Sequence, residues 1–232
     1  MIVERLTPSR DELARALAAD IAQRLADAVA TRGQASMVAT GGSTPGPVYD
    51  ALSRTAAPWD RVAVTLSDER WVSPDDPASN ERLLRGRLLR DLAAEARLIP
   101  LKTPSTSPAE AAAEVDRTLN ALARPFDVTL LGMGADGHVA SLFPHAPELA
   151  AALDDDAPLV CAVRRADAAG AAERLSLTRR ALLDSRAIMV LIEGAEKLAI
   201  YRRARAGEDI EAMPIRMVLQ QRRAPVQVWW AP

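Results

Sequence analysis

Short apolar runs alternate with stretches of helical periodicity along most of this chain. Apolar runs bounded by Gly, Pro or charged residues are typical of strands that are buried on both faces of a sheet. Between many of these runs, apolar residues recur every three or four positions, which is the spacing of one helix face. The expected strands are 36–40, 61–66, 98–101, 126–131, 159–163, 174–178, 187–192 and 226–230.

The longest helical pattern lies near the N-terminus. Ser9 can cap this helix, Glu12 completes a capping box, and Gly33 ends it. Strands that alternate with helices predict an α/β fold with a doubly wound, mostly parallel sheet flanked by helices. We expect a single domain over residues 1–232, with a small α/β excursion. The other expected helices begin near 48 and span 80–92, 108–123, 195–205 and 214–220.

A glycine-rich loop follows the central strand 126–131 and contains Asp136 and His138. Glycines directly after a buried strand allow a sharp turn and close approach to a ligand. Open parallel sheets bind ligands outside the carboxyl ends of their strands, so we expect this Asp and His in a catalytic loop. Residues 132–137 also match G-x-G-x-x-G, but a dinucleotide site requires an early βαβ unit and a downstream acid that are not evident here. A structural turn without chemistry is the other alternative.

A second glycine-rich loop joins the strand 36–40 to a helix, and it contains Gly41, Gly42, Ser43 and Thr44. Free backbone N–H groups and the positive end of a helix dipole favour an anion at such a turn. The loop lacks a Gly-Lys-Ser/Thr ending, so a single phosphate fits better than a nucleoside triphosphate. A Gly/Pro turn with a Ser/Thr cap is the structural alternative.

Charged residues at two further helix and strand ends are candidates for the same site. Arg70 has the planar fork that binds two phosphate oxygens, and Asp68 lies on the same side by strand alternation. Lys197 falls in the first turn of the helix 195–205, where a cation opposes the helix dipole and a bound anion would relieve that cost. The alternatives are a solvated turn at Asp68–Arg70 and an incidental surface position for Lys197.

Composition excludes several classes of protein. The net charge of −2 argues against a general nucleic-acid-binding surface, and no apolar stretch approaches a membrane span. The N-terminus lacks the apolar centre of a signal peptide, so we expect a cytoplasmic protein. Cys161 is the only cysteine, which excludes an internal disulfide and a cysteine-based zinc site. The spacing of His138 and His145 fits no usual ligand pattern, so we expect no metal.

At these positions the chain resembles the 6-phosphogluconolactonase family, in the superfamily shared with glucosamine-6-phosphate deaminase and ribose-5-phosphate isomerase. The resemblance implies a NagB/RpiA-like fold and covers nearly the whole chain in the family's order. Its most specific part is the Asp-Gly-His-x-Ala-Ser-Leu-Phe-Pro segment 136–144. The other matching segments are 40–45, 67–72, 79–80, 131–135, 173–178 and 194–197.

The resemblance implies hydrolysis of a sugar-phosphate lactone, 6-phospho-D-glucono-1,5-lactone, by a monomer or small homo-oligomer without a cofactor. His138 would be the general base, because an imidazole with the ordinary pKa of about 6.5 is largely neutral at pH 7. Asp136 would orient the imidazole or stabilise its charged form. The residues implied to hold the phosphate end are Gly41, Gly42, Ser43, Thr44, Arg70, Lys197 and Arg174, with Asp68 facing the same cleft.

The chain departs from the family pattern before Glu173, where Ala169–Ala172 replaces the usual Lys- and Pro-rich run. A basic phosphate ligand is therefore missing, or Arg164 or Arg165 supplies it. The tail also lacks the acidic residue that is common after the tryptophans.

Two other functions share this fold. A glucosamine-6-phosphate deaminase/isomerase would carry an acid shortly after the Asp-Gly-His segment, where this chain has Leu142-Phe143-Pro144-His145. A non-enzymatic sugar-phosphate sensor would carry a separate DNA-binding segment, for which the residues before the first loop leave room for only one helix.

Overall fold

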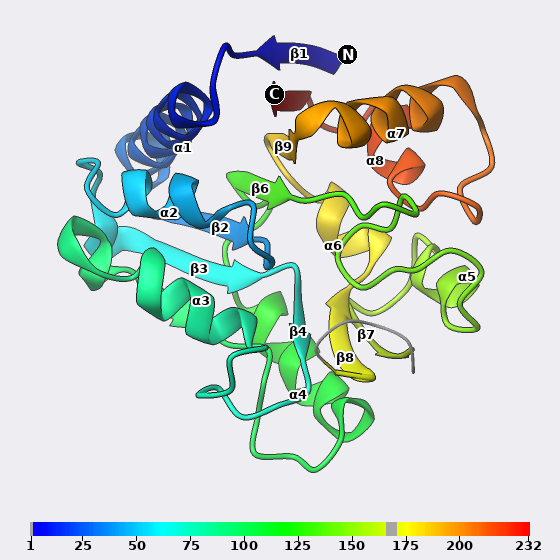
Figure 1. Cartoon of the computed structure of the whole chain (residues 1–232). Helices are drawn as coiled ribbons and strands as arrows, with labels where there is room; N and C mark the ends of the chain where they lie inside the picture. The colour runs from blue at the N-terminus through cyan, green and yellow to red at the C-terminus, as the bar shows by residue number, and fades with distance from the viewer. Residues whose placement is uncertain (1, 166–170) are drawn as a thin grey trace.

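The computed structural model describes residues 2–165 and 171–232, and it is built around two β-sheets (Figure 1). The larger sheet has seven strands in the order β1-β10-β9-β6-β2-β3-β5, and every neighbouring pair runs parallel. Its members are β1 (Ile2–Leu6), β2 (Ala35–Ala39), β3 (Val62–Leu66), β5 (Arg97–Ile99), β6 (Val128–Leu131), β9 (Ile188–Glu193) and β10 (Val226–Ala231).

The centre of this sheet is a topological switch point between β2 and β6. These strands pair through Met37 with Val128 and through Val38 with Thr129. From β2 the chain proceeds to β3 and β5 on one side, whereas from β6 it proceeds to β9 and β10 on the other. Open α/β sheets bind ligands in the crevice outside the carboxyl ends of the strands at such a point. Both glycine-rich loops begin there.

Helices flank the sheet, and the longest is α1 (Arg10–Arg32), which contacts β2, β6 and β10. Its ends are as predicted, because the Ser9 side chain accepts from the Glu12 N–H, and Gly33 adopts φ 76° and donates to the Val29 carbonyl. The other helices are α2 (Gly46–Leu52), α3 (Asn80–Arg87), α4 (Pro108–Asn120), α5 (Leu149–Ala152), α6 (Arg179–Leu183), α7 (Gly194–Ala206) and α8 (Arg216–Gln220), with 3₁₀ turns at Trp59–Arg61 and Asp91–Glu95.

The smaller sheet is antiparallel, in the order β4-β8-β7, and consists of β4 (Asp68–Arg70), β7 (Val160–Arg164) and β8 (Glu173–Leu177). Ser67 joins the two sheets, because its N–H donates to the Ala39 carbonyl at 2.8 Å and its carbonyl accepts from the Leu177 N–H at 2.8 Å. Helix α4 contacts both β7 and β8. This unit brings Asp68 and Arg70 beside the carboxyl ends of the main strands.

The predicted fold class is confirmed, with local differences. Strand β1 was not predicted, because most of its side chains are exposed and its place depends on pairing with β10 from the other end of the chain. The helix predicted over 80–92 is wrong at its end, since α3 stops at Arg87 and Asp91 adopts φ 49°. The predicted connection 166–172 lies largely outside the described residues. Within the described ranges, no helix has the length and apolar character needed to cross a lipid bilayer.

Candidate active site

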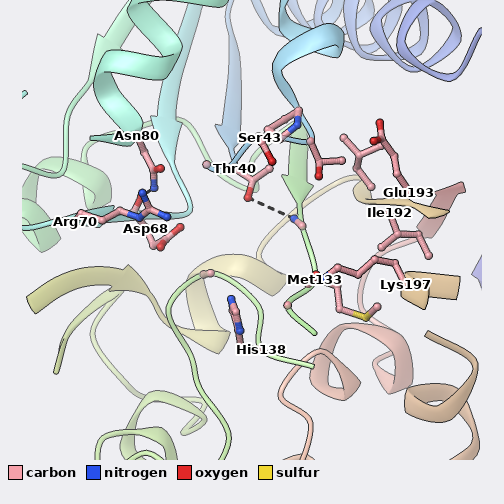
Figure 2. A pocket seen from close by; sticks show the side chains of 18 of the residues that line it. Thr40, Ser43, Asp68, Arg70, Asn80, Met133, His138, Ile192, Glu193 and Lys197 are labelled. Atoms are coloured by element: carbon pink, nitrogen blue, oxygen red, sulfur yellow. Dashed lines mark hydrogen bonds between the residues drawn. The ribbon is translucent and has the colours of Figure 1, made fainter. Parts of the chain in front are cut away.

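A pocket of about 310 Å³ lies at the switch point, and residues from both sheets line it (Figure 2). Nine of the ten site residues predicted from sequence line it, all except Asp136, which is hydrogen-bonded to the lining residue His138. These nine are Gly41, Gly42, Ser43, Thr44, Asp68, Arg70, His138, Arg174 and Lys197. The lining residues not predicted as site residues are Thr40, Pro45, Asn80, Gly132, Met133, Gly134, Ala140, Leu191, Ile192 and Glu193.

His138 and Asp136 form a close pair. Asp136 Oδ1 lies 2.6 Å from His138 Nδ1 and also accepts from the His138 backbone N–H at 3.0 Å. Burial opposes ionisation of Asp136, but these hydrogen bonds outweigh it and lower the pKa of Asp136 to about 2. An ionised carboxylate only accepts hydrogen bonds, so Nδ1 must be the donor. The neutral imidazole therefore carries its lone pair on Nε2, the atom available as a base.

The loop that carries this pair folds back on itself. The Gly134 N–H donates to the His138 carbonyl at 2.9 Å, and the Gly137 N–H donates to the Gly134 carbonyl at 3.1 Å. Gly137 adopts φ 86°, where a residue with a side chain would be strained. No helix follows the loop until Leu149, so there is no helix N-terminus to receive a pyrophosphate. The dinucleotide interpretation of residues 132–137 is therefore wrong.

The loop after β2 faces the same pocket from the other side. Gly42 adopts φ 91°, and a Cβ on Gly41 would lie 1.9 Å from Asn80 Oδ1. The two glycine-rich loops are joined directly, because the Gly132 N–H donates to Thr40 Oγ1 at 3.3 Å, the dashed line in Figure 2. No side chain caps helix α2, so the structural alternative of a Ser/Thr cap is wrong for Ser43 and Thr44.

The Asp68–Arg70 segment is not a solvated turn. Asp68 is buried, and its carboxylate accepts from Ser67 Oγ at 3.0 Å and from Ser141 Oγ at 2.6 Å. Asp68 and Arg70 face the pocket, whereas the intervening Glu69 is fully buried on the other side, against the first turn of α3. The side chains of this strand therefore alternate as predicted, with Asp68 and Arg70 on one side and Glu69 on the other.

Cationic side chains reach the pocket from β4, β8 and α7. Arg174 is buried, and its Nη1 lies 3.8 Å from Asp68 Oδ2. Lys197 Nζ donates to the Met133 carbonyl at 2.8 Å, which fixes the ammonium beside the His138 loop. Burial lowers the pKa of Lys197, and the negative charges of Glu196 and Asp136 oppose that shift. With Arg70, three cations among the described residues line the pocket against two carboxylates, Asp68 and Glu193, and this balance favours an anion.

Asn80 was missed as a site residue, although Ser79-Asn80 belonged to the matching segments. It begins α3, and its Nδ2 donates to the Asp68 carbonyl at 2.8 Å. Its position in the pocket depends on strand β4, whose place in the fold cannot be predicted from any short stretch of the sequence. Neither Arg164 nor Arg165 lines the pocket; Arg165 Nη1 instead lies 3.6 Å from Asp136 Oδ2. Across the described residues, no group of three or more His, Cys, Asp or Glu side chains is arranged to hold a metal ion.

Known proteins resemble this chain over nearly its whole length. A family model described as glucosamine-6-phosphate isomerases/6-phosphogluconolactonase matches residues 8–230. A 6-phosphogluconolactonase of Rhizobium meliloti is 44% identical over 221 residues, which cover 95% of this chain and 94% of the relative. The crystal structure of a 6-phosphogluconolactonase from Shewanella baltica superposes with a TM-score of 0.96 at 41% identity, covering 100% of this chain and 98% of the other.

The fold is shared more widely than the sequence. A monomeric glucosamine-6-phosphate deaminase superposes with a TM-score of 0.80 at only 18% identity, over 97% of this chain and 96% of the other. A likeness at that level concerns the fold alone, so the assignment depends on the family model and the high-identity relatives. This chain therefore belongs to the glucosamine-6-phosphate isomerase/6-phosphogluconolactonase family.

Proposed function

We propose that this chain is a 6-phosphogluconolactonase, which hydrolyses 6-phospho-D-glucono-1,5-lactone to 6-phospho-D-gluconate. The relatives with more than 40% identity over almost their whole length carry this name. The observation that carries the proposal is the 2.6 Å contact between His138 Nδ1 and Asp136 Oδ1 at the edge of a cationic pocket. This contact leaves His138 Nε2 unprotonated. Nε2 can then act as a base on a water molecule beside a lactone carbonyl bound in the pocket.

In the proposed mechanism, His138 Nε2 accepts a proton from a water molecule as its oxygen attacks the lactone carbonyl. The resulting tetrahedral intermediate collapses, the bond from carbon to the ring oxygen breaks, and the imidazolium returns its proton to that oxygen. Asp136 remains ionised throughout and stabilises the imidazolium, as a buried carboxylate partner does in hydrolytic triads. General-base catalysis of this kind contributes roughly 10²–10⁴-fold to the rate.

The phosphate end of the substrate is proposed to bind to the loop Gly41–Thr44 and to the cations Arg70, Arg174 and Lys197. Gly42 and Ser43 are exposed, and Ser43 and Thr44 do not cap helix α2, so their hydroxyl and N–H groups are available to an anion. Arginine binds phosphate through two parallel hydrogen bonds, and lysine binds it as a point charge. These contacts hold the substrate while water attacks its other end.

The proposal is tested with His138→Ala, assayed for lactone hydrolysis and for binding of 6-phosphogluconate. We expect kcat to fall at least about 100-fold while product affinity stays within a few-fold, because the phosphate contacts remain. His145→Asn is the matched control: His145 is the only other histidine, it is exposed, and Asn tolerates its φ of 54°. Unchanged hydrolysis by the His138 variant would refute the base assignment.

The amino-sugar-phosphate deaminase is the nearest rival. In the region where those relatives carry a proton-relaying acid, the ring that contacts His138 is Phe143, with centroids 4.7 Å apart. A phenyl ring carries no transferable proton, so ring opening of an amino sugar would lack its second acid. Parallel assays of both substrates decide, and ammonia release from glucosamine 6-phosphate would overturn the choice. A sensor would bind 6-phosphogluconate without turnover of the lactone.

The cellular setting is also proposed from the reaction class. We infer a cytoplasmic enzyme that acts as a monomer or small homo-oligomer and requires neither a cofactor nor a metal. Cell fractionation, light scattering and activity after treatment with a chelator test these statements separately. Activity lost on chelation and restored by a metal would refute the last of them.

A further inference from the structure

Arg165 directly follows β7, and its guanidinium lies beside Asp136 of the proposed catalytic pair Asp136–His138 without lining the pocket. Resting on the proposed function, we propose that Arg165 is a positioning residue, which holds the second oxygen of Asp136 and thereby keeps the carboxylate aligned with His138. The sequence makes Arg164 or Arg165 a candidate to bind the substrate phosphate, which is a different role.

The two oxygens of Asp136 have separate neighbours. Oδ1 accepts both hydrogen bonds from His138, and Oδ2 lies 3.6 Å from Arg165 Nη1. The Asp136 side chain is 38% exposed, so its packing alone leaves room for the carboxylate to rotate. An ion pair at Oδ2 opposes this rotation, because turning the group would move Oδ1 away from the imidazole.

The Phe143 ring supports the guanidinium, and a strand hydrogen bond fixes the backbone of Arg165. Its central carbon lies 4.6 Å from the centre of the Phe143 ring, the same ring that contacts the His138 imidazole at 4.7 Å. Phe143 is 4% exposed and is therefore a fixed support. The Arg165 backbone N–H donates to the Ala172 carbonyl at 2.8 Å, continuing the pairing of β7 with β8. Phe143 thus places the base and the arginine around one carboxylate.

Charge also favours a positioning role over a chemical one. An arginine side chain stays protonated at any pH used for an assay, so Arg165 does not exchange protons with Asp136 or His138. Its positive charge stabilises Asp136 as the ionised acceptor on which the His138 tautomer depends. A small misalignment of a general base lowers the rate of the chemical step, whereas it leaves substrate binding at the phosphate end unchanged.

The test measures kcat and KM for Arg165→Gln, Arg165→Lys and Arg164→Gln in the full chain. Arg164 is the adjacent arginine, is exposed and does not line the pocket, so its variant is the matched control. We expect Arg165→Gln to lower kcat about 10-fold with KM within about two-fold. Arg165→Lys, which keeps the charge, is expected to recover most of kcat, and Arg164→Gln is expected to match the wild type.

The decisive comparison measures the effect of Arg165→Gln in a chain that already carries Asp136→Asn. If Arg165 acts only through Asp136, the change Arg165→Gln has little further effect on kcat when Asp136 is already Asn. A second readout is the downfield proton resonance of the His138 Nδ1–H, which is expected to broaden in Arg165→Gln and to persist in Arg164→Gln. This signal reports the pair in folded protein independently of turnover.

Each other outcome overturns the inference. A rise in KM at constant kcat would make Arg165 a phosphate ligand, and an undiminished effect in the Asp136→Asn background would give it a role apart from the pair. Equal kcat values and proton signals in the two arginine variants would leave Arg165 without a role. Failure of the proposed function is recognised separately, because the wild-type chain itself would then not hydrolyse the lactone.

Discussion

Gly134 and His138 are packed so closely that a Cβ at position 134 would lie 2.0 Å from the imidazole Nδ1. The same atom would lie 2.7 Å from Asp136 Oδ1, which accepts the imidazole hydrogen bond. The absence of a side chain at position 134 is therefore what allows the proposed base to lie against its loop. A glycine-rich sequence here serves the placement of the ring as well as the turn.

Gly134→Ala is expected to lower kcat at least about 100-fold with little loss of thermal stability. The methyl group displaces an imidazole that can rotate away, and a displacement of about 1 Å at a reacting group costs about 10²-fold. Steady-state kinetics and a melting curve measure the two effects. The control is Gly86→Ala, in the exposed part of α3, where a Cβ meets nothing within 4 Å. A Gly134→Ala enzyme with normal kcat would show that the ring position is not critical.

Gly41→Ala is expected to raise KM at least about 10-fold with a smaller effect on kcat. Its Cβ would lie 1.9 Å from Asn80 Oδ1, so either the loop moves away from the pocket or the Asn80 amide is displaced. Adding Asn80→Ala removes the obstacle, although it also removes the hydrogen bond from Nδ2 to the Asp68 carbonyl. The double variant should therefore recover part of the lost affinity for 6-phosphogluconate, measured by calorimetry. A purely additive loss in the double variant would contradict this steric account.

The features predicted correctly from the sequence are those that depend on neighbouring residues. Apolar runs gave the buried strands, Ser9 and Gly33 gave the ends of α1, and glycines after strands gave both loops of the pocket. Asn80 was missed because its role depends on a contact with Gly41, a residue far from it in the chain.

Two strands of the antiparallel sheet, β7 and β8, were predicted, but its third strand, β4, and its separation from the main sheet were missed for a related reason. Strand β4 has only three residues and all of them are charged, so its local pattern is that of a turn. It becomes a strand because it pairs with β8 at Asp68–Ser176, more than a hundred positions further along the chain. Pairing over such separations is a property of the assembled fold, which periodicity in a short window does not contain.

Binding of 6-phosphogluconate is expected to weaken in the alkaline range because of Lys197. Burial lowers the pKa of this ammonium, which therefore loses its proton at a lower pH than an ordinary lysine. The charge that attracts the phosphate is present below that pKa and is lost as the pH rises through it. Calorimetry between pH 7 and about 10 measures the effect without interference from spontaneous lactone opening.

Two variants distinguish Lys197 from the other cations of the pocket. Lys197→Arg keeps its charge over this range because the guanidinium pKa exceeds about 12, so its affinity should stay constant with pH. Lys197→Met should bind at least about 10-fold more weakly at pH 7 and show no further alkaline loss. An alkaline loss that persists in Lys197→Met would assign the titration to a different group.

Glu69→Gln is expected to destabilise the fold without changing the chemistry. Glu69 is fully buried and accepts from the backbone N–H groups of Arg70 at 2.7 Å, Asn80 at 2.8 Å and Glu81 at 2.7 Å, and from Ser79 Oγ at 3.1 Å. Burial raises the pKa of Glu69, and these four donors oppose that shift. The carboxylate thus anchors the start of α3 to β4. In glutamine, an NH₂ group replaces one of the accepting oxygens and faces donors.

Each oxygen of Glu69 accepts two of these hydrogen bonds, so the NH₂ group faces two donors. Leaving a buried donor unpaired costs about 1–3 kcal/mol, so about 2–6 kcal/mol is expected for this substitution. For a chain of this length, that corresponds to a Tm lower by roughly 4–24 °C. The kcat of the folded variant should stay within about three-fold of wild type, because Glu69 does not line the pocket. Glu110→Gln, at an exposed first turn of α4, is the control and should leave Tm nearly unchanged. A Glu69→Gln enzyme that loses kcat while keeping its Tm would instead place this carboxylate in the catalytic step.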